Sequence, residues 1–424
     1  MALDLSTTDY FSDDSLIQDP YPYYEFAREQ GPVWCEPVRG AFVVTGYEEL
    51  CTIFRDLDAY SSCNGFAGPF HELPKEPGSD DLTGLINKHR DKFAFHENLV
   101  TFDPPTHTAH RGLMMRLLTP KRLQENEEFM WRLADDQIDG FAAAERCDFV
   151  ADYAQPFSLL VIADLLGVPE EDRPLLRQRI LANSPAGSIG QPPPANPLAY
   201  LEEFFIPYVE ARRQGPRDDV LTQMARATFP DGTMPEVIEV VRAAVILFAG
   251  GQGTSARFQV GILQLLAEQP ELQRELRRDP GRIPDFVEEA LRWSSPTKIS
   301  FRMARKTTTL AGVQIPAGGT LMLMLSAADR DPRRFECPAE FRVDRPDSRQ
   351  HIAFGRGVHS CPGGPLARAE GRITTERILA RLDDIRVSEA EHGRPDARRW
   401  SYTPSYILRG LEALHLEFTT SRSL

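Results

Sequence analysis

The chain of 424 residues has little cysteine, and its cysteines form no C-x-x-C pair. The six thiols are scattered along the sequence, at Cys35, Cys51, Cys63, Cys147, Cys337 and Cys361. Cysteines spaced in this way in a long chain do not predict a disulfide framework. A structural zinc site is not indicated either, because such sites usually draw their ligands from closely spaced pairs.

Positive charge is also scarce, with 48 lysines and arginines against 62 acidic residues and a formal net charge of -14. An acidic chain repels nucleic acid and anionic lipid, so we expect neither as a partner. The first twenty residues have no basic segment and no apolar run, which argues against a signal peptide or a membrane anchor. The most apolar stretch elsewhere, Ala243–Ala249, is too short to span a bilayer. We therefore expect a cytoplasmic protein without an anchor.

What the sequence does contain is a helix-rich block next to smaller strand-rich parts, and it shows no internal repeat or linker. The predicted fold class is mainly α with a smaller β part (α+β), in a single domain that spans residues 1–424. Helices are expected over 105–296 and 364–385, and strands near 30–60, 300–330 and 400–420.

Helical spacing of apolar residues predicts helices at Tyr24–Gln30, Met130–Phe141, Phe157–Leu166, Tyr200–Arg212 and Val237–Ala267, with a loop at Ser188–Pro194. Strands are predicted at Ala41–Thr45, Leu310–Ile315, Thr320–Leu325, Tyr406–Arg409 and Leu414–Thr419.

The strongest chemical signal is the segment His351–Gly364, which reads HIAFGRGVHSCPGG. Gly355 and Gly357 allow a tight loop, and Cys361 stands just before a helical run. A thiol in that position meets the free N–H groups and the dipole of a helix N-terminus, which favour its anion as a metal ligand. Two other readings of the residues stay open: an inert buried cysteine, and a zinc site with His351 and His359, although a fourth zinc ligand is missing.

The order of residues in this segment resembles the heme-binding signature of the cytochromes P-450. The matching pattern is Phe354-Gly355-x-Gly357-x-His359-x-Cys361-x-Gly363, followed by Leu366-Ala367-Arg368-x-Glu370. The resemblance implies that Cys361 is the proximal ligand of the iron of heme b, where a thiolate favours O–O cleavage. It implies that Phe354 and Gly355 belong to the cofactor loop. It also implies the family's fold, with a long central I helix over the heme.

Further landmarks of the family follow in the expected order. Glu289-x-x-Arg292 resembles its E-x-x-R pair, and Arg345 resembles the arginine that completes a fold-supporting triad. The segment from Asp103 to Arg111 resembles the entrance of the C helix. By this resemblance four residues are expected to donate to the heme propionates: His107, Arg111, Arg302 and His359.

The middle of the expected I helix departs from the family pattern. It reads Ala249-Gly250-Gly251-Gln252-Gly253-Thr254-Ser255, so Thr254 stands where the family has its alcohol and Gly253 where it has an acid. The catalytic candidates are therefore Thr254, Gly253 and Gln252, and the proton route is left to Gln252, Ser255 or ordered water. A second departure is Pro362, which has no N–H to donate to the sulfur of Cys361; proline is also ordinary at the start of a helix.

The resemblance implies a monooxygenase that uses dioxygen to hydroxylate or dealkylate a small, apolar or aromatic organic substrate. The alternatives are a peroxide-driven peroxygenase and a heme-binding protein without turnover. The chain has no G-x-G-x-x-G loop for a nucleotide, so electrons are expected from a ferredoxin-type donor with its reductase. The expected dock for that donor is basic: Arg111, Arg116, Lys121, Arg122, Arg356, Arg368 and Arg372.

Five segments are expected to form the substrate pocket by family analogy: Cys63–Val100, Ala182–Leu201, Ile246–Thr254, Pro296–Phe301 and Thr403–Tyr406. The phenylalanines of the first segment suggest an apolar or aromatic ligand. Lys298 either meets a carboxylate or phenolate of the substrate or points to solvent.

Overall fold

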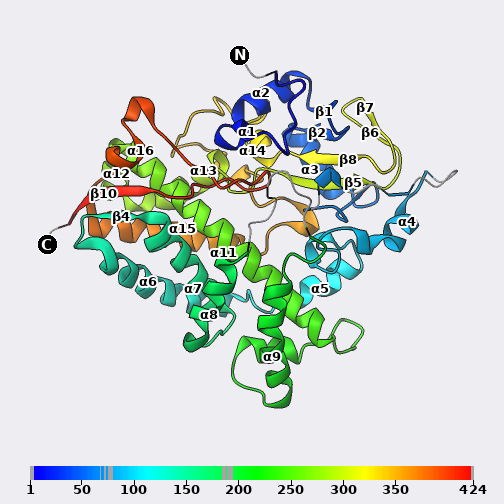
Figure 1. Ribbon diagram of the computed structural model, residues 1–424, viewed down its shortest axis with the longest axis horizontal. Helices are drawn as coiled ribbons and strands as arrows, with labels where there is room; N and C mark the ends of the chain where they lie inside the picture. Colours follow the sequence, from blue (N-terminus) through cyan, green and yellow to red (C-terminus); the bar gives the residue numbers. More distant parts are fainter. Residues whose placement is uncertain are drawn as a thin grey trace.

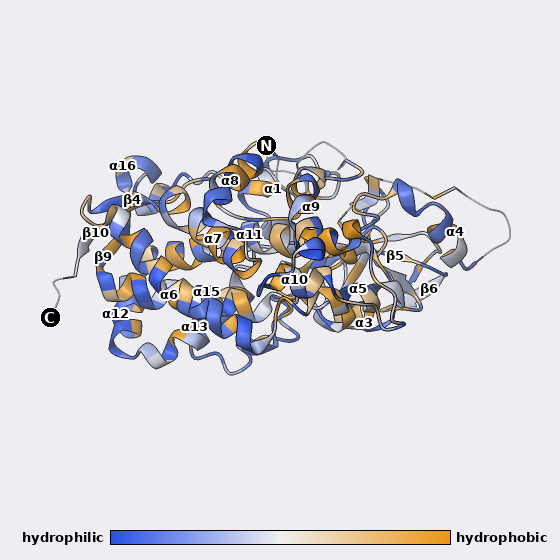
Figure 2. Ribbon diagram, turned by 90° about the horizontal axis from the view of Figure 1, so that it is seen from below, coloured by the Kyte–Doolittle hydropathy of each residue, from blue (hydrophilic) through white to orange (hydrophobic). Residues whose placement is uncertain are grey.

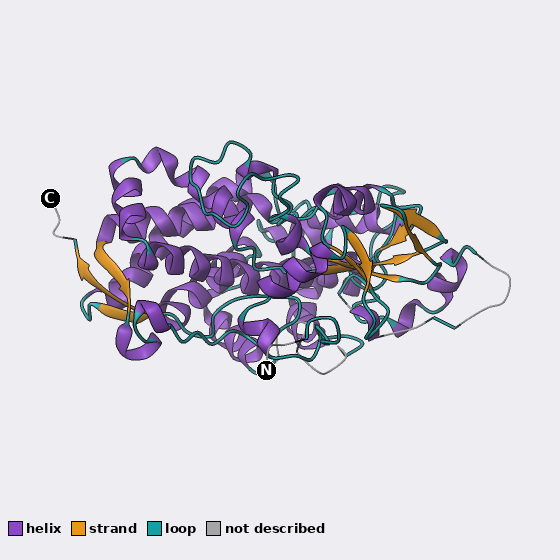
Figure 3. Cartoon of the chain, turned by 90° about the horizontal axis from the view of Figure 1, so that it is seen from above, coloured by secondary structure: helices purple, strands orange, loops and turns teal. Residues whose placement is uncertain are grey.

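The computed structural model describes residues 4–66, 68–70, 73–74, 80–183, 188 and 194–421. Strands lie at two ends of the molecule and helices fill the space between them (Figure 3). The predicted α+β class is confirmed. The helices are α1 Ser15–Gln18, α2 Tyr21–Glu29, α3 Tyr47–Arg55, α4 Thr83–Lys88, α5 Thr106–Met114, α6 Pro120–Ala142, α7 Gln155–Leu165, α8 Arg173–Leu181, α9 Ala199–Gln214, α10 Val220–Ala225, α11 Val237–Glu268, α12 Pro270–Arg278, α13 Ile283–Trp293, α14 Leu325–Ala328, α15 Gly364–Arg381 and α16 Glu389–His392.

In the described part of the chain, the strands form three sheets. One has the order β1-β2-β8-β5-β3, one has the order β4-β10-β9, and β6 pairs with β7 alone. Their bounds are β1 Val33–Cys35, β2 Phe42–Val44, β3 Tyr60–Ser61, β4 Arg146–Asp148, β5 Ser300–Ala304, β6 Thr308–Leu310, β7 Val313–Ile315, β8 Thr320–Leu323, β9 Leu382–Val387 and β10 His415–Thr420.

The long helix α11 crosses the molecule diagonally and organises the helical part (Figure 1). It begins with a capping box, in which the side chains of Glu236 and Glu239 each accept a backbone N–H of the other's residue. It packs against α7, α9 and α15. Apolar residues of these helices form the largest hydrophobic cluster, whereas outer helices such as α12 and α16 are hydrophilic (Figure 2).

Of the described helices, α11 is long and apolar enough to cross a membrane by length and composition alone. The stretch Ala243–Ala249 is therefore part of a longer apolar segment than the sequence suggested. The same composition is needed by a helix that is packed on several sides, and α11 is packed in this way.

Several boundaries predicted from the sequence are wrong, each because a turn or a non-local contact decided the conformation. The segment Leu310–Ile315 is a hairpin rather than one strand, since Ala311 and Gly312 take positive φ angles of 47° and 81°. Leu325 begins α14, and 382–385 belongs to β9 rather than to a helix. Tyr406–Arg409 forms only an isolated bridge, between Leu408 and Thr297. Most of the loop expected at Ser188–Pro194 lies outside the described residues.

Candidate functional site

The loop before Cys361 is shaped by two glycines in left-handed conformation. Gly355 has a φ of 63° and Gly357 a φ of 70°. A Cβ atom at Gly357 would lie 2.3 Å from the carbonyl oxygen of Phe54, so no other residue fits there without a shift of the backbone. The loop is closed by the N–H of Cys361, which donates to the carbonyl of Phe354 at 2.8 Å. These contacts hold Cys361 directly in front of α15.

Cys361 is exposed to solvent on one side, and on the other side its sulfur lies against hydrogen-bond donors. Burial raises its pKa, and the N–H groups of Gly363 and Gly364 and the charge of Arg111 act in the opposite direction. Proline at 362 thus leaves the sulfur with two backbone donors from the following residues. A thiolate held by N–H groups at a helix start, with a cation nearby, is the donor expected for a thiolate-ligated iron.

The four basic residues expected around the propionates come from three separate elements and meet in space. His107 and Arg111 lie on α5, Arg302 lies on β5, and His359 lies in the Cys361 loop. The ring centroids of His107 and His359 are 4.1 Å apart. Burial and the charge of Arg302 lower the pKa of His359 to about 2, and burial and the charge of Arg111 lower that of His107 to about 4. The cluster therefore disfavours further positive charge.

Two features show that this cluster fits an anionic group. Both ring nitrogens of His107 are buried without a hydrogen-bond partner. Arg302 is buried and, among the described residues, forms no ion pair; its Nη1 donates to the carbonyl of Phe301 at 2.6 Å. Buried donors without partners are unfavourable, and a carboxylate placed among them would satisfy them. His359 is already engaged, with Ser62 Oγ 3.0 Å from its Nε2. The residues present therefore fit heme and its propionates.

The middle of α11 shows how its glycines and its threonine are arranged. Thr254 Oγ1 donates to the carbonyl of Gly250 at 2.5 Å. Gly250 is exposed although it lies in the middle of an otherwise packed helix, and an added Cβ there would meet nothing within 4 Å. The carbonyl of Gly253 accepts from Arg257 Nη1 at 2.8 Å. Gln252 is half-buried.

A buried polar network next to Thr254 was not predicted from the sequence. Glu370 on α15 is hydrogen-bonded to Ser255 and to Gln259. Gln259 also contacts Ser158 and Thr374. In the sequence, Glu370 was noted only as part of the pattern that follows Cys361. Its burial depends on how closely α11 approaches α15. Burial raises the pKa of Glu370 from 4.5 to about 8.

We expect Glu370→Gln to stabilise the protein more at pH 8.5 than at pH 5.5. A carboxyl whose folded-state pKa is raised contributes stability that is present below its unfolded pKa and is lost as pH rises through the folded value. Between 4.5 and about 8, each pH unit lowers the wild-type stability by about 1.4 kcal/mol relative to glutamine. Urea unfolding at the two pH values measures this, with the exposed Glu271→Gln as the control. An equal effect at both values would contradict the buried carboxylic acid.

The expected fold-supporting triad is assembled. Arg292 donates to both oxygens of Glu289 at 2.7 and 2.8 Å, and Arg345 donates to Glu289 Oε1 at 3.0 Å. Their remaining N–H groups donate to backbone carbonyls, including those of Asp329 and Glu340. Asp329 in turn accepts the N–H of Ile352 at 2.7 Å, at the start of the cysteine loop.

The zinc alternative finds no support in the described part of the chain, where no group of three metal-ligating side chains is present. His351 instead lies 3.1 Å from Glu288, which also binds Arg368 at 2.6 Å. Glu288 is buried on α13 and binds Arg368 of α15 and His351. The sequence did not predict this role, because Glu288 belongs to no recognised motif. Among its neighbours, His351 and Arg368 lower its pKa to about 2 against the opposing effect of burial.

Lys298 does not point to solvent, and that expectation is wrong. Its side chain is buried, and Nζ donates to the carbonyl of Ser405 at 2.8 Å. Burial lowers its pKa to about 7. Among the expected aromatic wall residues, Phe93 and Phe95 are buried in hydrophobic clusters, whereas Phe66 is half-exposed beside Phe95. Parts of the two segments 63–100 and 182–201 lie outside the described residues.

Comparison with known proteins gives a consistent result. The family model for cytochrome P-450 matches residues 213–391. Cytochrome P-450 144 of Mycobacterium tuberculosis is 30% identical over 94% of this chain and 89% of its own length. The 6-deoxyerythronolide B hydroxylase of Saccharopolyspora erythraea is 31% identical over 97% of this chain and 98% of its own. The solved structure of substrate-free cytochrome P-450 CYP150A6 of Mycobacterium marinum is 50% identical, with a TM-score of 0.92 over 99% of this chain and 100% of that one.

Proposed function

The chain belongs to the cytochrome P-450 family, and from that premise we propose that Cys361 ligates the iron of its heme b and that His107, Arg111, Arg302 and His359 hold the propionates. Membership makes the protein a heme-dependent monooxygenase that uses a redox partner, dioxygen and an organic substrate. The observation that supports these site assignments most directly is the Cys361 thiol, with its two N–H donors and Arg111 nearby.

Heme supplies the activation of dioxygen, and the chain supplies the surroundings. Phe354 and Gly355 shape the loop that presents the Cys361 sulfur, and Gly363 and Gly364 hold it by hydrogen bonds. On α11, Gly250 leaves open space, and beside it the hydroxyl of Thr254 donates to the carbonyl of Gly250. Gly253 and Gln252 complete this turn, where Gly253 supplies a carbonyl rather than an acid.

For the substrate we propose a small apolar or aromatic molecule. The partly exposed apolar side chains that pack on the main core include Phe66, Val100, Ile246 and Ala249. Two of them lie on α11 just before Gly250, so they favour an apolar ligand next to that turn. The test is a screen for compounds that shift the heme spectrum by displacing iron-bound water. Tight binding of only highly charged compounds would contradict the proposal.

The electron donor that we propose is a ferredoxin-type protein with its reductase, docking on the face near Cys361. Val358, three residues before Cys361, is exposed, and a groove of about 310 Å³ lies between the starts of α6 and α15. The expected basic dock is smaller than the sequence suggested. Arg111, Arg356, Arg368 and Arg372 are engaged by Ser360, Tyr47, Glu288 and Glu127. Lys121 is exposed but lies 3.7 Å from Glu125, so Arg116 and Arg122 remain to meet the donor.

We expect Arg116→Glu to slow reduction by a plant-type ferredoxin and its reductase, on the order of tenfold at low salt. Arg116 is exposed and, in the described part of the chain, forms no ion pair, so it can act on a docking protein. The effect should fade as salt rises, because screening shortens the reach of the charge. Stopped-flow reduction measures it. Arg146→Glu is the control, since β4 lies at the left end of the molecule and α5 lies to the right of its centre (Figure 1). A reduction rate that does not change with ionic strength would contradict docking at this basic surface.

A peroxide-driven reaction is the second candidate, because Gly253 carries no acid. Replacing reductant by hydrogen peroxide separates the two, since a monooxygenase should form more product with NADPH, ferredoxin and dioxygen.

We further propose that residues 1–424 fold as one domain and that the protein is cytoplasmic, as expected from its acidic composition. Limited proteolysis and cell fractionation test these two statements.

A further inference from the structure

A stripe of small and polar residues runs along one face of α11, toward its carboxy-terminal end. Its members follow at intervals of three and four residues, which places them on a single helix face: Gly250, Thr254, Arg257, Gly261, Gln264 and Glu268. Most other positions of this helix are apolar and buried. Glu268, at the end of the stripe, is exposed. From Thr254 to Glu268 the helix rises about 21 Å.

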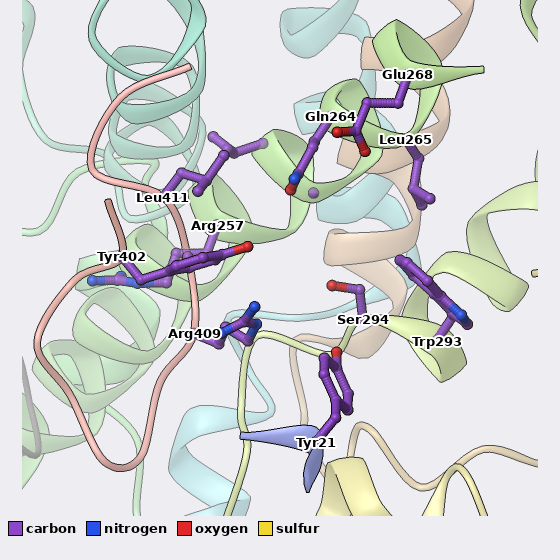
Figure 4. A pocket seen from close by; sticks show the side chains of 13 residues that line it. Tyr21, Arg257, Gln264, Leu265, Glu268, Trp293, Ser294, Tyr402, Arg409 and Leu411 are labelled. Carbon is purple, nitrogen blue, oxygen red and sulfur yellow. The ribbon is translucent and has the colours of Figure 1, made fainter. Parts of the chain in front are cut away.

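The carboxy-terminal half of this stripe lines a cavity of about 90 Å³. Gln264 and Glu268 lie on consecutive turns of α11, and the loop that carries Tyr402, Arg409 and Leu411 lies opposite them (Figure 4). About 10–15 Å³ of such space is enough to hold one water molecule, so the cavity has room for water. Its polar lining provides the partners that buried water requires.

Arg257 joins this cavity to the turn that carries Thr254. It lines the cavity, and its Nη1 donates to the carbonyl of Gly253 at 2.8 Å. Its Nε is buried without a partner, and no carboxylate of the described residues pairs with it. An arginine does not lose its charge in a protein, so its free N–H groups need acceptors. Water in the cavity can supply them.

Gly410 makes this position of Arg257 attainable. A Cβ atom at Gly410 would lie 2.4 Å from Cγ of Arg257 and 2.8 Å from its Cδ. The carboxy-terminal loop therefore closes directly over the arginine stem. On the other side, a Cβ atom at Gly253 would lie 3.0 Å from Nη1 of Arg257. An acid at 253 would thus stand against this guanidinium, and in this chain the guanidinium is present without the acid.

We propose that the cavity between α11 and the carboxy-terminal loop holds the water that supplies protons to the turn of Thr254, and that Arg257 positions this water at the carbonyl of Gly253. The inference rests on the proposed monooxygenase function. Each turnover converts substrate C–H, one dioxygen, two electrons and two protons into C–OH and one water. The electrons come from the ferredoxin-type donor. The protons enter from solvent near Glu268 and pass between hydrogen-bonded waters, while Arg257 keeps its own proton.

Two variants test the route from different ends. Arg257→Met removes the guanidinium and keeps an unbranched stem under Gly410. Gly261→Leu fills the cavity; the nearest atom to an added Cβ there is Ser294 Oγ at 3.8 Å, so space is available. In both, product formed per NADPH oxidised should fall on the order of tenfold, which is below the roughly 10²–10⁴-fold typical of a positioned general acid or base. Peroxide release and the solvent deuterium isotope effect should rise. The control is Gly140→Leu on α6, where an added Cβ meets nothing within 4 Å.

Gly253→Asp completes the series, because it supplies an acid beside Thr254. It should restore much of the coupled product yield in Gly261→Leu, whose cavity is blocked. All variants should keep the carbon monoxide spectrum of a thiolate-ligated heme and their substrate affinity. Loss of that spectrum from the wild-type protein would instead overturn the proposed function.

A readout that is independent of turnover is the crystal structure of the holoenzyme. It should show ordered water within hydrogen-bonding distance of Nε or Nη2 of Arg257, and no such water in Gly261→Leu. A dry cavity in the wild-type protein overturns the proposal. The proposal is also overturned if Gly261→Leu and Arg257→Met, as single variants, both form as much product per NADPH as the wild type. It is overturned as well if Gly140→Leu loses as much product per NADPH as they do.

Discussion

Cys361→Ala is expected to abolish both monooxygenase activity and the red-shifted Soret band of the reduced carbon monoxide complex. That band depends on thiolate ligation, and alanine offers no ligand. The surrounding loop should persist, because its closing hydrogen bond runs from the backbone N–H of residue 361 to the carbonyl of Phe354. Heme held by the basic cluster alone should show a spectrum without the thiolate signature.

The measurement is a difference spectrum of purified protein, together with heme content and thermal unfolding. Cys35→Ala is the matched control, since Cys35 is an exposed thiol on β1. It should leave spectrum, heme content and turnover unchanged. A thiolate-type band that survives in Cys361→Ala would remove Cys361 from the site, and with it the assignment of the loop.

Glu289→Ala is expected to lower the free energy of unfolding by about 3–5 kcal/mol, because it leaves two buried guanidinium groups without their carboxylate. Total stability of a domain is typically about 5–15 kcal/mol, so this loss is large. The side chains of Glu289 and Arg292 are fully buried, and that of Arg345 is 2% exposed. The loss should extend to the cysteine loop, since Arg292 holds the carbonyl of Asp329 and Asp329 holds Ile352.

Urea unfolding of the holoenzyme followed by circular dichroism, with heme content measured alongside, tests this expectation. If Glu289→Ala does not accumulate, Glu289→Gln gives the same comparison with one acceptor retained, and should lose less. Arg386→Ala breaks an exposed pair with Glu417, where both side chains are more than a third exposed. Such pairs contribute about 0–1 kcal/mol, so this control should differ little from wild type. A similar loss in both variants would contradict the role of the triad.

The candidate site was predictable to the extent that its residues follow one another in the chain. The loop from Phe354 to Gly363 is a local motif, and its glycines announce the left-handed conformations that the structure shows. The spacing of His107 and Arg111 places both on one face of α5. Long periodic helices such as α6 and α11 were also found, because apolar spacing is a local property of the sequence. Their neighbours in space were not.

Only the tertiary structure decided which polar groups are buried and which partners they have. Lys298 looked like a surface or substrate contact, and it is buried against the carbonyl of Ser405. The segment Tyr406–Arg409 has the composition of a strand, but no neighbouring strand pairs with it beyond one bridge. Sequence spacing carries no information on either outcome, because both depend on chain segments more than a hundred residues away.

The sequence by itself therefore determined the family, the cysteine loop, the helix periods and the absence of an acid at Gly253. The tertiary structure decided what stands next to that glycine. Arg257 lies one helical turn away in sequence, but the covering of its aliphatic stem depends on Gly410, which is contributed by the distant carboxy-terminal loop. The depth of Glu370 likewise depends on how closely α15 approaches α11. The physical reason is that conformational preference is set by neighbouring residues, whereas burial, and with it the energy of a charge, is set by whatever the fold brings alongside.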